Sequence, residues 1–226
     1  MIRPPRSVLS IFAFTLLASF ALAPFANRAD AYPKPSPYPI SWQLKFEHSA
    51  PHRMVYLTPG DPAPKAYWYI TFTVTNLTDQ EQMFLPSFDM LTKDGKIIAS
   101  DKDVPPGAFD EAKRRERNSQ LQPLQQVKGK LLIGEDQTRE GVAIWPESSL
   151  RMGTFHIFVA GLSGEAVIMK DGEETQIKDW TKVSEEERNK QSILRKTLDL
   201  TYQVAGDVSQ GSPNEPRLVS EDWVMR

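Results

Sequence analysis

Histidine spacing is the first place to look for metal chemistry in this chain of 226 residues. His48 and His52 are four residues apart, as in a helical metal site, but Pro51 lies between them and interrupts any helix. Met152 and His156 could offer soft ligands of the kind copper carriers use, yet no second pair accompanies them. We therefore predict no metal site and no cofactor.

Ser163 is the candidate nucleophile, because it lies in the string Gly161-Leu-Ser163-Gly164-Glu165. A nucleophile elbow requires glycine two residues after the serine, where this chain has Glu165. A tight turn explains the glycines without catalysis. The chain has no cysteine, which excludes thiol nucleophiles, thiolate zinc sites and redox dithiols. No carboxylate pair can be nominated for acid–base chemistry, so the sequence predicts no catalytic residue.

Two patterns point instead to binding. Tyr67 and Tyr69 flank Trp68, and on an open sheet face they would form an aromatic platform for a sugar or a protein partner. Aromatic residues on a central strand are more often covered by a second layer, and this alternative stays open. The basic run 113–117 could dock an acidic partner, although charge runs of this kind usually form a solvated helix face.

The N-terminus predicts export. Arg3 and Arg6 precede an apolar run from Val8 to Ala26, and Ala29-Asp30-Ala31 has the small-x-small pattern that signal peptidase recognises. We expect residues 1–31 to be a cleaved signal peptide and Tyr32 to begin a secreted or periplasmic protein. The alternative is an uncleaved anchor, because the apolar run is long enough to span a bilayer.

Charge and composition limit the classes of binding partner that we expect. The chain carries 27 basic and 29 acidic residues, which argues against nucleic acid or an anionic membrane as the main partner. Without cysteine there are no disulfides, so stability must come from the core that the 40% hydrophobic content can supply. We expect a soluble domain with no stable membrane insertion after cleavage.

Alternating hydrophobicity after the leader predicts a mainly β domain. Proline at every second position suggests that residues 32–39 form an extended spacer, followed by a domain over 40–206 and a C-terminal tail over 207–226. Ile40, Trp42, Leu44 and Phe46 alternate with polar residues, and Trp68, Ile70, Phe72 and Val74 define a second strand within 67–75. Further strand candidates are 83–85, 130–133, 142–145, 154–160 and 197–204.

Turn and helix signals complete the prediction. Asp94-Gly95 and Asp171-Gly172 each lie between apolar runs and predict hairpins. Helical insertions are expected after Asp103, where acidic residues precede basic ones, and at 184–192, where Ser184 and Glu187 have the spacing of a capping box. Without a helix–strand–helix rhythm, the sequence favours an antiparallel β-sandwich with one or two short helical insertions.

Several strings resemble a family of uncharacterised exported bacterial proteins: 67–76, 86–88, 129–132, 141–146, 158–165 and 223–226. The strand and turn Val74-Thr-Asn-Leu-Thr78 also resembles a common feature of immunoglobulin-like domains. What the resemblance implies is an immunoglobulin-like fold, with no activity, ligand or catalytic residue attached to it.

Three functional hypotheses follow. The first is a non-enzymatic structural or protein-binding module of the cell envelope. The second is a carbohydrate or cell-surface glycan binder that uses Tyr67 and Tyr69. The third is a hydrolase with an unrecognised carboxylate site.

Overall fold

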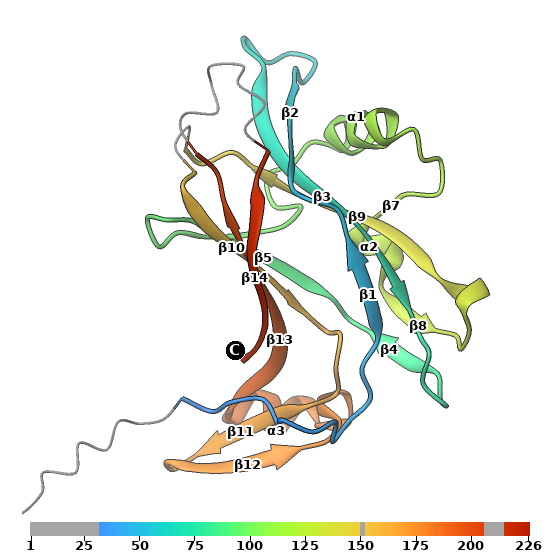
Figure 1. Ribbon diagram of the computed structural model, residues 1–226, viewed down its shortest axis with the longest axis vertical. Helices are drawn as coiled ribbons and strands as arrows, with labels where there is room; N and C mark the ends of the chain where they lie inside the picture. The colour runs from blue at the N-terminus through green and yellow to red at the C-terminus, as the bar shows by residue number, and fades with distance from the viewer. Residues whose placement is uncertain (1–31, 150–151, 206–214) are drawn as a thin grey trace, which may run out of the picture. The chain divides into compact units, whose positions relative to one another are not determined.

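The computed structural model describes residues 32–149, 152–205 and 215–226 (Figure 1). The predicted leader lies outside these residues. In the described part of the chain, none of the helices has the length and apolar character needed to cross a bilayer. Fourteen strands in the described residues form two large sheets and one small one, so the predicted β-sandwich character is confirmed.

The first sheet has five strands, with the order β1-β3-β9-β7 and with β2 also paired to β3. Its strands are β1 (Lys45–His48), β2 (His52–Tyr56), β3 (Lys65–Thr75), β7 (Gln122–Pro123) and β9 (Arg139–Pro146). β1 and β2 follow one another along the same edge of β3, because Lys45 pairs with Thr75 and His52 pairs with Tyr69. β3 is therefore an internal strand with β9 on its other side.

The second sheet has seven strands, with the order β12-β11-β13-β10-β5-β6 and with β14 on β13. Its strands are β5 (Ser87–Leu91), β6 (Ile97–Ala99), β10 (Thr154–Ala160), β11 (Ala166–Lys170), β12 (Glu173–Ile177), β13 (Ser192–Gln203) and β14 (Arg217–Met225). Both predicted Asp-Gly hairpins are confirmed as β5–β6 and β11–β12.

The remaining elements are short. A separate two-stranded sheet pairs β4 (Gln82–Phe84) with β8 (Gly129–Leu131). The helices are α1 (Pro106–Glu116), α2 (Leu124–Val127) and α3 (Glu185–Lys190), with 3-10 turns at Glu135–Gln137 and Trp180–Lys182. α3 starts with the predicted capping box between Ser184 and Glu187.

The core between the two sheets explains why the chain folds this way. Trp68, Ile70, Phe72 and Val74 all have an exposed fraction of 2% or less, which confirms the predicted alternation in β3. Inward residues of β10 and β13 meet them from the second sheet, including Phe155, Ile157, Leu198 and Leu200. Burial of this apolar surface from two facing sheets is the main force that holds a sandwich together.

Two predicted boundaries differ from the structure. The strand expected from Ile40 begins only at Lys45, although Leu44 is buried and Trp42 packs against the core. The predicted tail 207–226 contains β14, which pairs with β13 over nearly its whole length. The segment 217–222 lacks a clear alternation, so its strand conformation depends on pairing with β13 rather than on local sequence.

The predicted spacer is also not free. Pro33 is buried, and the backbone N–H of Ser36 donates a hydrogen bond of 2.6 Å to Glu165 Oε1. Residues 32–36 therefore pack on the domain instead of extending away from it (Figure 1). The proline pattern predicted an extended chain, but contacts with distant residues decide whether such a chain is free or docked.

Candidate functional site

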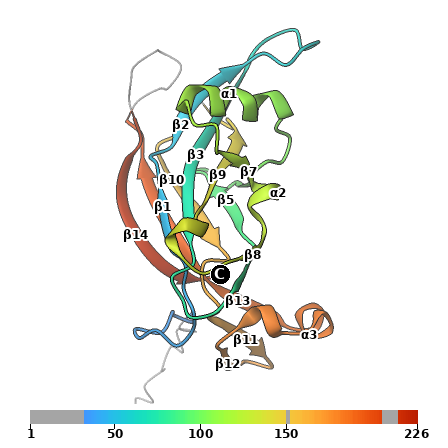
Figure 2. The same ribbon diagram turned by 90° about the vertical axis from the view of Figure 1, so that its right-hand side faces the viewer.

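The two tyrosines singled out by the sequence lie on the outer face of the first sheet, beneath α1. Tyr67 and Tyr69 have exposed fractions of only 2% and 3%. They form a second apolar cluster, distinct from the core between the sheets, with Met54, Val142 and Ile144 of the neighbouring strands. The helix closes this cluster with Ala108 and Ala112, which are completely buried. Figure 2 shows α1 lying across the strands of this sheet.

Small side chains let α1 approach the sheet closely. A Cβ atom added at Gly107 would lie 1.9 Å from the hydroxyl oxygen of Tyr56, so any larger residue here would require the Tyr56 side chain to move. Near the other end of the helix, the Tyr69 hydroxyl donates a 2.7 Å hydrogen bond to Glu116 Oε1. Burial and this carboxylate raise the pKa of Tyr69.

The covered position of both rings corrects the hypothesis of an open aromatic platform. A sugar that stacks on an aromatic ring needs an accessible ring face, and α1 occupies that side of Tyr67 and Tyr69. The alternative named from the sequence, a covering layer over a central strand, describes what the structure contains. The helical insertion predicted after Asp103 provides that layer.

The basic run on α1 is partly neutralised within the helix. Glu111 accepts hydrogen bonds from Arg114 at 2.8–2.9 Å and from Arg115 at 2.7 Å. These two guanidinium groups lower the pKa of Glu111 to about 2. The first turn of α1 contains no acidic residue, whereas its last turn is basic. Of the two favourable interactions with the helix dipole that the sequence predicted, only the one at the C-terminal end is therefore present.

Beside α1 the first sheet forms an open cavity of about 280 Å³. Three carboxylates line it from three different elements: Glu47 of β1, Glu116 of α1 and Glu140 of β9. Each accepts a hydrogen bond from a neutral donor, namely Thr73, Tyr69 and Asn118 respectively. The cavity therefore suits cations or hydrogen-bond donors. Nevertheless, the described residues contain no group of three or more His, Cys, Asp or Glu arranged to hold a metal ion.

The other residues singled out by the sequence, Ser163, Met152 and His156, make contacts that stabilise the fold. Ser163 is 1% exposed, and its hydroxyl donates to the backbone carbonyl of Trp42 at 3.1 Å. It therefore stabilises the turn before β11. Met152 is buried in the core, whereas His156 lies on the outer face of the second sheet, with its Nδ1 2.9 Å from Asp199 Oδ1. The paired ligands considered for copper are thus separated.

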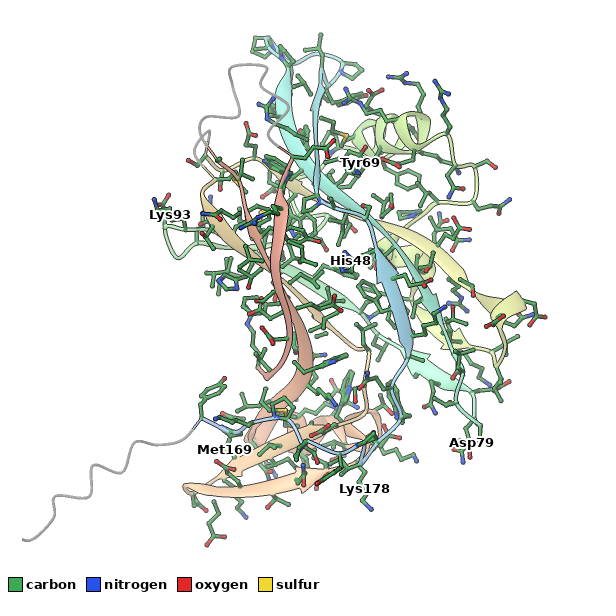
Figure 3. All side chains as sticks on the ribbon, viewed as in Figure 1. His48, Tyr69, Asp79, Lys93, Met169 and Lys178 are labelled. Carbon is green, nitrogen blue, oxygen red and sulfur yellow. The ribbon has the colours of Figure 1, made fainter. Side chains whose placement is uncertain are left out.

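The outer face of the second sheet carries a row of stacked side chains. The rings of His156 and Phe158 have centroids 5.7 Å apart and are nearly parallel. The Arg226 guanidinium lies 4.2 Å from the Phe158 ring centroid and also donates a hydrogen bond to Asp89. Charges on this face are thus compensated by contacts within the protein. His48, labelled in Figure 3, instead lies at the first sheet's edge, with Nδ1 3.1 Å from the Tyr202 hydroxyl.

Exposed apolar side chains occur in and directly next to the strands of the small β4–β8 sheet. One side of it is buried, since Phe84 and Leu131 are 0% exposed. The opposite side and the adjoining loops expose large apolar residues, which we call the β4–β8 face: Leu77 (53%), Met83 (42%), Leu85 (36%), Leu132 (43%) and Ile133 (47%). Asp79, labelled in Figure 3, marks the turn that leads into β4.

Local contacts hold the β4–β8 face in place. Asn76 is buried and uses its side-chain amide to donate to the carbonyls of Gln80 and Leu131, at 2.8 and 3.1 Å. Asn76 also forms a parallel bridge with Ile133. Sequence reasoning identified 130–133 only as a strand. The pair Leu131-Leu132 was the available signal, because successive strand residues point to opposite sides and a two-stranded sheet has only one covered side, whereas the exposure of Ile133 follows from the end of β8 at Leu131.

Comparison with known proteins gives no relative: no family model matches the chain, and no curated protein or solved structure shows significant similarity to it. The functional assignment therefore rests on the geometry described above.

Proposed function

We propose that this protein is an exported, non-enzymatic module with an immunoglobulin-like sandwich that binds another protein through the β4–β8 face. The observation that carries the proposal is the concentration of exposed apolar side chains in this small sheet and in the chain directly next to its strands. Single apolar residues are normal on protein surfaces, but several large ones close together in the chain and on paired strands are typical of an interaction site. Lys130, which pairs across the small sheet with Met83, forms a 2.8 Å ion pair with Glu81 and adds polar contacts beside these apolar residues.

Strand order supports the immunoglobulin-like part of the proposal. In such domains, strands A, B and E neighbour one another in one sheet, and C, F and G do so in the other. The antiparallel series β1-β3-β9 and β5-β10-β13 have the same chain order and the same neighbours. β6 then occupies the place of C′. The connection between β6 and β9 departs from the pattern, because it contains α1, α2 and a β7 that runs parallel to β9.

Binding through the β4–β8 face can be tested by photo-crosslinking in an envelope extract. A photoreactive residue at position 83 should give a saturable adduct that excess unlabelled wild-type protein prevents. The double substitution Met83→Glu and Leu132→Glu should abolish that competition, because it places two charges on the apolar surface. Ile97→Glu is the matched control, since Ile97 is 57% exposed but belongs to β6.

Two results would contradict this assignment. One is an adduct that forms equally well from position 97, which would indicate nonspecific contact. The other is undiminished competition by the double variant, provided that its circular dichroism spectrum matches that of wild type.

Export has its own test. Mass spectrometry of the protein recovered from its native compartment should identify Tyr32 as the first residue. Recovery of the chain with Met1 in a membrane fraction would establish the uncleaved anchor instead.

A further inference from the structure

The first described residues form an N-terminal segment, Tyr32–Ser36, that is held on the domain at two points. Pro33 is buried, and residues 32–35 line a cavity of about 450 Å³ together with Trp223, Val224 and Met225 of β14. At its other end, the backbone N–H of Ser36 donates to Glu165 Oε1 at 2.6 Å. The segment is thus fixed between the C-terminal strand and the start of β11.

The acceptor for Ser36 is a buried ion pair. The side chains of Glu165 and Lys196 are 1% and 9% exposed, and Lys196 Nζ lies 3.1 Å from Glu165 Oε2. The same ammonium group lies 5.1 Å from the ring centroid of Trp223. A buried carboxylate needs hydrogen-bond donors in addition to its ion-pair partner, and the Ser36 amide supplies one. Gln176 Nε2 also donates to Glu165 Oε1, but at 3.5 Å, so the N-terminal segment supplies the shorter of the two hydrogen bonds to this oxygen.

This docking site is assembled from distant parts of the chain. Glu165 precedes β11, Lys196 belongs to β13, and Trp223 belongs to β14. β14 follows every other described element in the sequence, and it pairs with β13 through Lys196 and Met225. The N-terminal segment consequently has no complete docking site until β14 has been translocated and has paired with β13.

We propose that docking of residues 32–36 ends the period in which the leader can be removed. The inference rests on the proposed export leader, because Tyr32 is the first residue after the expected cleavage site. In that reaction a signal peptidase adds water across the Ala31–Tyr32 peptide bond, which leaves a carboxylate on Ala31 and an amine on Tyr32. A protease needs an accessible, extended chain beyond this bond. The Tyr32 side chain is 60% exposed, but the burial of Pro33 and the hydrogen bond of Ser36 hold the chain that follows it on the domain.

The experiment uses the folded full chain, residues 1–226, with signal peptidase in detergent micelles. Ser36→Pro removes the amide proton that Glu165 accepts and keeps an extended conformation. Ser36→Ala is the matched control, because it retains the N–H. Mass spectrometry follows the appearance of chains that begin with Tyr32. We expect wild type and Ser36→Ala to resist cleavage and Ser36→Pro to be cut about tenfold faster, as for loss of a hydrogen bond to a charged group.

Equal cleavage rates for folded wild type and Ser36→Pro, whether fast or slow, would overturn the inference. So would a Ser36→Ala rate as high as that of Ser36→Pro. A pulse-chase experiment during export separates this result from failure of the leader itself. If the wild-type protein keeps Met1 throughout export, the signal peptide is refuted. If the leader is removed rapidly during export but folded wild type and Ser36→Pro are cleaved at equal rates, only the protective docking is refuted.

Discussion

The outer faces of the two large sheets differ in what covers them. In the first sheet, α1 buries Tyr67 and Tyr69 as completely as residues of the central core. In the second sheet, His156, Phe158 and Arg226 remain partly exposed. His156 and Arg226 pair with carboxylates on the same face, and Phe158 contacts both of them. One face is thus stabilised by a third apolar layer, and the other by side-chain pairs at the surface.

The outward-facing residues of a strand indicate whether another layer of the protein covers that strand. β3 is apolar or aromatic on both sides along its first half, as expected for a strand that is buried on both faces. The outward positions of β13, in contrast, include Asp199 and Thr201, which suit water. In this sandwich an inserted helix covers only the sheet whose central strand has apolar residues on its outer side.

The largest effect is expected in the core that both faces share. Phe72→Ala should reduce the free energy of unfolding by roughly 3–5 kcal/mol, because it leaves a cavity among buried rings. The Phe72 ring lies 4.8 Å from that of Phe88 and packs directly over Gly141, where an added Cβ would be 2.4 Å from its Cζ. Urea unfolding would measure the loss, and a change below about 1 kcal/mol would contradict the register of β3.

Tyr69→Ala tests whether the covered outer face is equivalent to the core. We expect a loss of about 3 kcal/mol, since the ring is buried and α1 would lose a main contact. Tyr69→Phe is the control for the ring alone, and it should cost only about 1 kcal/mol through loss of the bond to Glu116. A near-neutral Tyr69→Ala variant would mean that α1 does not cover this face in solution.

The hydroxyl of Tyr69 also predicts a dependence on alkaline pH. Its pKa is raised in the folded protein, so the neutral form contributes stability that is present below the unfolded value of about 10 and is lost as the pH rises above it. Tyr69→Phe should remove this part of the alkaline loss. Parallel stability curves for wild type and Tyr69→Phe between pH 9 and 11 would indicate that Tyr69 does not titrate differently in the folded state.

Phe158→Ala makes the corresponding test on the open face. The side chain is only partly buried and contacts His156 and Arg226, so we expect a loss of about 1 kcal/mol. Thermal unfolding of this variant beside Tyr69→Ala compares the two outer faces directly. A loss as large as that of Tyr69→Ala would show that the open face contributes as much to folding as the covered one.

Local sequence signals predicted part of this architecture well. The alternation in β3, the two Asp-Gly hairpins and the capping box of α3 depend on neighbouring residues, and all are confirmed. The docking of α1 on Tyr69, the pairing of β14 and the attachment of Ser36 to Glu165 depend on residues far apart in the chain. Spacing within a segment cannot report such contacts, because the partner is not in the segment.

The smallest effect is expected at Thr73, which shares a face and a strand with Tyr69 but lies beyond α1. Thr73 borders the acidic cavity, and its hydroxyl donates a long, 3.3 Å hydrogen bond to exposed Glu47. Thr73→Ala should therefore change the free energy of unfolding by on the order of 1 kcal/mol or less. If urea unfolding instead showed a loss near that of Tyr69→Ala, coverage by α1 would not be the reason for the difference along β3. A small loss would assign that difference to the helix, because strand, sheet and face are the same for both residues.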